Sequence, residues 1–444
     1  MSRRTLFGHP IGLTFLALTE VWERFSFYGI SSLVLLYMLD HLLNPAGALG
    51  VTGLSSFRHA IEAITGPLSD QAFASQTLGL FTGLVYFTPI FGGILADRWL
   101  GRKPTVVLGI LLLGFGNVTL SIESSFLVGL LLIIAGTGCL KGNISAQVGK
   151  LYAPDEESQR TQAFVIFSAA INTGALLGPL ACGILAARAN WEAGFMVASI
   201  MMVVALATYI AGSRYIPSET KEKRRAERQP LTKHDWGTIA VLLGLMLLAT
   251  LPLAAYYQEF NVVQLFIREA VDRDLLGWSV PTASFISLDG FFGVLLVPLL
   301  IAAWRKLSVL NREPSDAGKL AIGCTLIGLA NLVFALAAAR AQGGHPVGMV
   351  WPLIFFGVNA LGFLCCWPTL LAVFSRAAPT QVNSTFMGVL YLTLFFANLL
   401  VGRLAGFWLT WTHTFFFEMH ALLAFAATIL TLVVKSYLDR RLGS

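Results

Sequence analysis

Apolar runs of roughly twenty residues recur along the whole chain and are separated by short polar segments. An α-helix of that length crosses the hydrocarbon core of a bilayer, where backbone polar groups must be satisfied internally. Hydrophobic residues make up 56% of the 444 residues and charged residues only 12%, a balance that excludes an ordinary soluble domain. The sequence therefore predicts an all-α integral membrane protein with about twelve transmembrane helices. The predicted spans are residues 11–39, 77–97, 104–122, 126–148, 162–186, 193–212, 236–267, 283–304, 319–340, 349–375, 384–407 and 415–436.

The positions of the basic residues predict the orientation of these spans, because cytoplasmic loops are enriched in Lys and Arg. With both termini in the cytoplasm, 22 of the 30 basic residues lie on the cytoplasmic side, 5 lie outside, and 3 (Arg24, Lys141 and Arg403) lie within or near the membrane. The formal net charge of +6 is thereby explained by topology, and no nucleic-acid partner is expected.

The longest charged connection, "SRYIPSETKEKRRAERQPLTKHD", divides six spans from six. We therefore predict an N-terminal six-helix bundle at 1–212, a cytoplasmic linker at 213–235 and a C-terminal six-helix bundle at 236–444. This layout resembles the major facilitator fold. The other long connection, residues 40–76, contains "NPAGALG" and "TGPLSD" and is predicted to be irregular or partly helical on the outer side.

Three charged residues interrupt the first span, in the stretch "LALTEVWERFSFYGI". Glu20, Glu23 and Arg24 share one helix face, so Arg24 can reach either carboxylate. One interpretation is a self-neutralising salt bridge without further role; the other is a functional site, because each charge at mid-bilayer depth costs about 2.5–3.5 kcal/mol. Lys141, in the fourth span, needs a carboxylate, and Glu20 and Glu23 are the only buried ones in the N-terminal half, so we predict that they pair.

Three motifs resemble those of known transporters. "GGILADRWLGRKP" resembles the G-x-x-x-D-R-x-G-R-[RK] signature of the major facilitator superfamily, although an ordinary basic loop is the alternative. "EVWERFSFYG" resembles E-x-x-E-R-F-x-Y-Y-G of the proton-dependent oligopeptide transporter family. "GTGCLKGNISAQVGKLY" resembles that family's G-x-G-x-x-K-P-N-[IV]-S, with Gly142 in place of Pro. The resemblance continues in order along nearly the whole chain.

The resemblance implies a set of site residues. The proton-coupling residues that it implies are Glu20, Glu23, Arg24 and Lys141. The cytoplasmic gate motif that it implies comprises Gly93, Asp97, Arg98, Gly101 and Arg102. The expected substrate-binding residues are Tyr28, Tyr86, Lys141, Asn172, Gln258, Glu259, Asp289 and Trp367, with Tyr256 and Tyr257 as further candidates for an aromatic lining.

Departures from the family pattern concern the substrate. Ser31 stands where relatives usually carry an Arg, Phe27 where they carry Tyr, and Leu390 where Trp is common. Phe363 replaces the Glu that in relatives faces the peptide amine. Asp289, where the family usually has Asn, could supply the missing carboxylate because both spans belong to the C-terminal half, or it could merely pair with Arg403. Glu259 resembles the family's acidic gate residue, but the usual partner of that residue is the Arg that Ser31 replaces here, which argues against a gating role.

The resemblance implies a proton-coupled symporter that imports di- and tripeptides across the bacterial inner membrane by alternating access. No nucleotide-binding loop or catalytic arrangement is present in the sequence, so the chain is predicted not to be an enzyme and to use a proton gradient without cofactor or metal. Expected partners are a small peptide, protons and membrane lipid, and the chain is expected to be a monomer. The alternatives are a proton-coupled transporter of another small anionic or zwitterionic solute, a drug–proton exporter, and a non-transporting sensor on the same fold.

Overall fold

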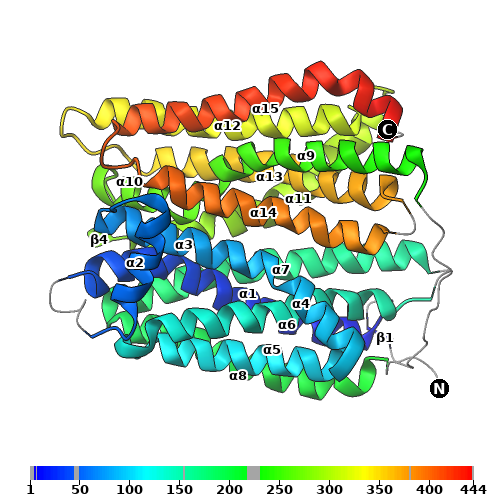
Figure 1. Ribbon diagram of the computed structural model, residues 1–444, viewed down its shortest axis with the longest axis horizontal. Coiled ribbons are helices and arrows are strands. Elements are labelled where there is room, and N and C mark those ends of the chain that lie inside the picture. Colours follow the sequence, from blue (N-terminus) through cyan, green and yellow to red (C-terminus); the bar gives the residue numbers. More distant parts are fainter. Residues whose placement is uncertain are drawn as a thin grey trace. The chain divides into compact units, whose positions relative to one another are not determined.

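The computed structural model describes residues 5–6, 8–44, 50–153, 156–217, 231–379 and 382–442, and these are almost entirely helical (Figure 1). The α-helices are α1 (Ile11–Tyr37), α2 (Leu54–Thr65), α3 (Asp70–Phe87), α4 (Pro89–Leu95), α5 (Arg102–Leu120), α6 (Phe126–Lys150), α7 (Glu157–Arg188), α8 (Trp191–Gly212), α9 (Lys233–Tyr257), α10 (Val262–Ala270), α11 (Ser287–Val309), α12 (Asp316–Ala341), α13 (Val350–Ala377), α14 (Asn383–Ala405) and α15 (His413–Leu442). Short 3₁₀ or π segments are η1 (Met38–Leu42), η2 (Ala96–Leu100), η3 (Glu123–Ser125), η4 (Ser213–Tyr215), η5 (Gln258–Phe260) and η6 (Thr282–Ile286). Two hairpins pair β1 (Thr5–Leu6) with β2 (His9–Pro10), and β3 (Asp274–Leu275) with β4 (Trp278–Ser279).

Within these described ranges, 12 helical segments are long and apolar enough to cross a membrane, which confirms the predicted number of spans. Some are longer than predicted: the second runs over Asp70–Leu100. The helix is interrupted at Thr88, where α3 ends and Pro89 starts α4, because proline lacks the N–H that would continue the hydrogen-bond ladder.

Contacts between Cα atoms divide the chain into two compact units, Met1–Glu222 with Val280–Phe291, and Lys223–Ser279 with Phe292–Ser444. In the first unit, α1 packs against α7 and α8, and α5 packs against α6 and α8. Small residues permit these close crossings. A Cβ on Gly109 of α5 would lie 2.8 Å from the carbonyl oxygen of Gly136 in α6.

In the second unit, α12 packs against α13 and α15, and α9 packs against α14 and α15. Small residues permit a close crossing here too, because a Cβ on Gly362 of α13 would lie 3.0 Å from the carbonyl oxygen of Gly323 in α12. Figure 1 shows α12 and α15 side by side along their lengths.

The division differs from the predicted bundle boundaries in one segment, because Val280–Phe291 belongs to the first unit. Its η6 turn packs on α7, where a Cβ on Gly183 would lie 3.1 Å from the amide nitrogen of Ser284. Sequence order places this segment in the C-terminal half, but small residues on α7 let it pack against the N-terminal one. Much of the predicted linker, residues 218–230, lies outside the described residues.

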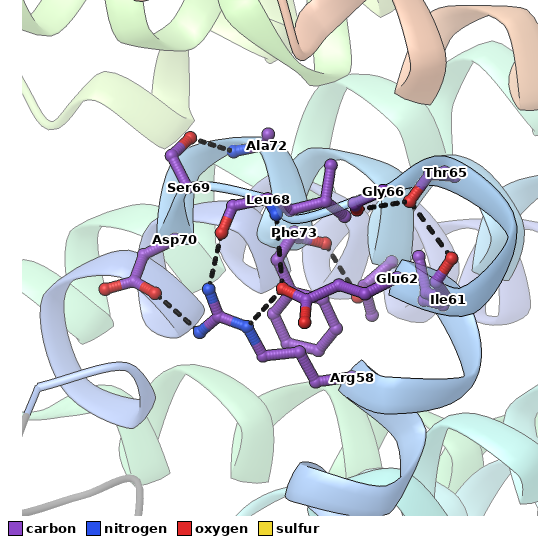
Figure 2. A network of polar contacts seen from close by, with 11 residues as sticks. Arg58, Ile61, Glu62, Thr65, Gly66, Leu68, Ser69, Asp70, Ala72 and Phe73 are labelled. Atoms are coloured by element: carbon purple, nitrogen blue, oxygen red, sulfur yellow. Dashed lines mark hydrogen bonds and ion pairs between the residues drawn. The ribbon is translucent and has the colours of Figure 1, made fainter.

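The long connection between the first two spans contains helix α2, which confirms the prediction of a partly helical segment within residues 40–76. Figure 2 shows how Arg58 ties α2 to the start of α3. Its Nε donates to Glu62 Oε1 at 2.9 Å, and its Nη1 donates to Asp70 Oδ1 at 2.7 Å. Its Nη2 donates to the carbonyl oxygen of Leu68 at 2.6 Å, so one guanidinium holds the helix, the turn and the next span together.

Candidate functional site

The first span buries three charged side chains inside the first unit. Glu20 and Arg24 are each 2% exposed and Glu23 is 0% exposed. The guanidinium of Arg24 binds Glu23 through two hydrogen bonds, Nε to Oε2 at 2.5 Å and Nη2 to Oε1 at 2.6 Å, and its Nε also lies 3.3 Å from Oε1 of Glu20. Arg24 therefore contacts both carboxylates, whereas the sequence predicted that it could reach either. Two carboxylates and one guanidinium leave one negative charge to be balanced in the interior.

Helix α7 fixes the position of this charge cluster. A Cβ on Gly174 would lie 2.5 Å from the Cβ of Arg24 and 2.6 Å from the carbonyl oxygen of Val21, so only glycine allows α7 to cross α1 here. Asn172, a predicted substrate residue, precedes this crossing by two positions and is half-buried. The backbone contact therefore brings Asn172 to the level of the charge cluster.

Lys141 extends the network from α1 to α6 and α3. Its Nζ lies 4.1 Å from the ring centroid of Tyr86, within the range of a cation–π interaction. Lys141 also lies within electrostatic range of Arg24, which repels it, and of Glu23 and Glu20, which attract it. Two carboxylates are thus balanced by two cations. Which carboxylate pairs with Lys141 directly stays a prediction.

Two aromatic rings of α1 cover the guanidinium. Arg24 Cζ lies 5.0 Å from the ring centroid of Phe27 and 5.9 Å from that of Tyr28. Phe27, which replaces the usual Tyr of the family, therefore packs on the cation without offering it a hydroxyl group. Tyr28 is half-buried beside the same cation, so the structure brings this predicted substrate residue to the cluster.

The predicted gate motif forms the connection between α4 and α5. Gly101 has φ of 81°, a conformation that favours glycine, and Arg102 Nη2 lies 3.5 Å from Asp97 Oδ1. Apart from the backbone of its own helix and its chain neighbours, no described atom lies within 4 Å of the position that a Cβ on Gly93 would take. The neighbouring Gly92 faces α6 at Gly138 instead, since the helix turns only one of the two glycines inward.

An aromatic stack surrounds the position of the missing carboxylate in the second unit. Phe363 of α13 stacks on Tyr256 of α9 with ring centroids 4.4 Å apart, and on Trp367 with centroids 6.4 Å apart. Trp367 in turn contacts Tyr391 of α14 at 5.6 Å. The predicted aromatic residues are brought together, and they present apolar ring faces where the family usually presents a charge.

The seventh span breaks at two other candidate residues, Gln258 and Glu259, which form the η5 turn between α9 and α10. The prediction of one continuous span over 236–267 is therefore wrong at this point, because Asn261 has non-helical dihedrals (φ −120°, ψ −109°). The polar groups that the break releases must find partners inside the protein. Asn359 of α13 provides one, since its Nδ2 donates to the Tyr256 carbonyl oxygen at 3.4 Å and to Glu259 Oε2 at 3.2 Å.

Gln258, the first residue of the η5 turn, is fully buried and has other partners than Glu259. Its Nε2 lies 2.9 Å from Nε2 of His420 in α15 and donates to the Val401 carbonyl oxygen at 3.4 Å. Nδ1 of His420 lies 2.8 Å from the Phe416 carbonyl oxygen, which can only accept, so Nδ1 carries the proton and Nε2 accepts from Gln258. These bonds occupy Gln258 within the second unit, and its role as a substrate ligand stays a prediction.

Asp289 lies in the first turn of α11, within the segment that belongs to the first unit. This segment packs on α7, whereas the rest of α11, from Phe292 on, belongs to the same unit as Phe363. That Asp289 supplies the carboxylate missing at Phe363 stays a prediction. A Cβ on the adjacent Gly290 would lie 2.9 Å from the carbonyl oxygen of Asn172. An acidic side chain in the first turn of a helix is also favoured by the helix dipole.

Sequence reasoning missed Asn359 and His420 as members of this site. His420 lies inside the predicted span 415–436 and is fully buried. A polar residue inside an apolar run was the available signal for both, but their common partner, the break at η5, is visible only in the structure.

This chain is similar to known transporters along nearly its whole length. The profile of the POT family matches residues 105–233 and 220–419. A di-/tripeptide transporter of Lactococcus lactis subsp. lactis (strain IL1403) is 28% identical over 100% of this chain and 98% of its own length. A mutant of the peptide transporter POT in complex with alafosfalin is 26% identical, with a TM-score of 0.85 over 99% of this chain and 97% of that one.

A POT family transporter in complex with 5-aminolevulinic acid is 25% identical, with a TM-score of 0.83 over 97% of each chain. These matches extend over both units, and they confirm the resemblance that the three sequence motifs indicated. The chain is a multi-pass membrane protein that belongs to the POT family of transporters.

Proposed function

We propose that this protein is a proton-coupled symporter that imports di- and tripeptides across the bacterial inner membrane, as a monomer and without cofactor or metal. The relatives named above as peptide and di-/tripeptide transporters support the substrate class. The Lys and Arg distribution in the sequence supports cytoplasmic termini.

The buried charge cluster of α1 is the observation that carries this proposal. With both carboxylates ionised, Arg24 and Lys141 balance Glu20 and Glu23. Protonation of one carboxylate leaves one positive charge in excess, and the carboxylate of a peptide restores neutrality by binding Lys141. Loss of the peptide and of the proton to the cytoplasm returns the starting arrangement. Proton and substrate movement are coupled because neither charge is stable alone in a buried site.

A second candidate function is import of another small anionic or zwitterionic solute. The stack of Phe363 between Tyr256 and Trp367 favours it, because no carboxylate stands at the position that relatives use for the peptide amine. A relative bound to 5-aminolevulinic acid adds support, since that ligand is a small zwitterion without a peptide bond.

Uptake into proteoliposomes distinguishes these functions. The purified protein is reconstituted and offered a library of labelled di- and tripeptides, and separately 5-aminolevulinic acid, with and without an inward proton gradient. Gradient-dependent accumulation of peptides supports the proposal. Accumulation of 5-aminolevulinic acid with no peptide uptake supports the second candidate, and extrusion of hydrophobic cations under the same gradient would indicate an exporter.

A further inference from the structure

A groove of about 540 Å³ lies on the first unit between α5 and α8, away from the charge cluster of α1. Its walls are apolar side chains of the two spanning helices, among them Val107, Leu108, Leu111 and Ile210. Leu111 is 39% exposed and Ile210 is 56% exposed. An apolar concavity at this depth of a transmembrane unit is filled by hydrocarbon more favourably than by water.

One end of the groove is positively charged. Lys103, at the start of α5, donates from Nζ to the carbonyl oxygens of Ser213 and Ile216, both at 2.8 Å, and so ties α5 to the end of α8. An ammonium has three N–H donors, and these two bonds leave one for a further acceptor. No acidic side chain is among the described residues that line the groove. Arg214, exposed nearby in the chain, adds positive charge.

The sequence around the groove also favours an anionic occupant of the membrane. Seven basic residues occur from Arg214 to Lys233, both included, and this end of the spans is the one predicted to be cytoplasmic. Such clusters attract anionic lipid headgroups. The linker residues 217–232 contain one alanine and one leucine among polar and charged residues and prolines, so they offer no apolar segment to fill the groove.

We propose that this groove binds an anionic phospholipid of the cytoplasmic leaflet. An acyl chain lies along Val107, Leu111 and Ile210, and the phosphate accepts a hydrogen bond from Nζ of Lys103. The lipid covers the apolar wall between α5 and α8. Its phosphate is a charged partner for Lys103, the residue whose hydrogen bonds join these two helices. The site is separate from the proposed transport site, so it does not depend on which solute is transported.

Native mass spectrometry of the detergent-purified full chain tests the headgroup preference. Phosphatidylglycerol and phosphatidylcholine with identical acyl chains are added in turn, and the retained lipid is counted against concentration. We expect one phosphatidylglycerol to bind about fivefold more tightly than phosphatidylcholine, as one added cation near a lipid surface provides. Lys103→Gln should abolish this preference, while Lys103→Arg, which keeps the charge, should retain it.

A groove-filling variant tests the acyl-chain site without changing Lys103. Val107→Trp should remove the retained lipid of both kinds, whereas the matched change Leu131→Trp, at a 62% exposed position of α6, should leave lipid binding unchanged. The proposal is overturned if phosphatidylglycerol remains preferred in Lys103→Gln or if lipid is retained in Val107→Trp. It is also overturned if the wild-type protein is a dimer that retains no lipid. Thermal unfolding of each variant confirms that binding is compared between folded proteins.

Discussion

Replacement of Glu23 by glutamine should uncouple transport from the proton gradient. The amide resembles the protonated carboxyl in size and hydrogen bonding but cannot ionise, so Glu23→Gln holds the cluster in the substrate-ready charge state. We expect gradient-driven accumulation of dipeptide to be lost while exchange of labelled for unlabelled peptide persists.

The contacts of Arg24 set the size of the accompanying loss of stability. Removal of one partner from a buried ion pair costs about 3–5 kcal/mol. The lower end, about 3 kcal/mol, applies here because Glu20 remains 3.3 Å from Nε of Arg24 and the new amide oxygen can still accept one bond. Glu20→Gln is the matched control. It leaves both bonds between Glu23 and Arg24 intact and removes one longer contact, so about 1.5 kcal/mol is expected.

Thermal and denaturant unfolding in one detergent rank the two variants, and counterflow exchange in proteoliposomes separates substrate movement from accumulation. Wild-type accumulation by Glu23→Gln would refute the role of this carboxyl. A larger loss of stability in Glu20→Gln than in Glu23→Gln would refute the assignment of the two-bond pair as the main partner of Arg24.

Lys141→Ala should weaken dipeptide binding at least about tenfold, because it removes a charge-assisted bond to the substrate carboxylate, and an unchanged affinity by calorimetry would exclude it from the site. Asp289→Ala should weaken a free dipeptide about tenfold to a hundredfold and its N-acetylated form much less, as expected if it binds the amine; equal losses would indicate a structural partner such as Arg403. The hydrogen bond from Arg58, then that from the Leu68 N–H, holds the pKa of the Glu62 carboxyl below its ordinary 4.5. Its contribution to the stability of α2 is therefore complete above about pH 4.5 and lost as the pH falls through the lowered pKa. Hydrogen exchange, corrected for intrinsic rates, should distinguish the wild type from Glu62→Gln at pH 7, and the difference should shrink as the pH falls below 4.5. Asn359→Leu should cost about 1–3 kcal/mol, measured by unfolding, because the broken seventh span loses its donor to the Tyr256 carbonyl oxygen.

The number of spans could be predicted because every backbone polar group in hydrocarbon must be satisfied within a helix, which makes length and hydropathy nearly sufficient. The same reasoning failed at η5. The stretch "YYQEFNVVQLF" contains no proline or glycine, and its break is stabilised by Asn359 and His420, which come from spans about a hundred residues or more away in the sequence. Because these hydrogen-bond partners come from distant spans, the local sequence does not indicate the break.

The sequence predicted which residues form the charge cluster, but it did not predict which atoms are in contact. Helical spacing placed Glu20, Glu23 and Arg24 on one face, but it did not indicate that the bidentate bond joins Arg24 to Glu23, its immediate neighbour in the chain. Nor did it indicate that α7 crosses α1 at this point, through Gly174. Likewise, the sequence identified Phe363 as a lost carboxylate. Its stacking on Tyr256 depends on how α9 and α13 pack, which hydropathy does not specify.

Direct observation of peptide and protons moving together tests the central claim. The protein is reconstituted in vesicles that contain a pH-sensitive dye, an inside-negative potential is imposed with potassium and valinomycin, and dialanine is added outside. The account predicts that the lumen acidifies when the peptide is added, that labelled peptide accumulates in parallel, and that both signals are absent in Glu23→Gln vesicles. Peptide accumulation without acidification of the lumen, or identical acidification with and without peptide, would contradict it.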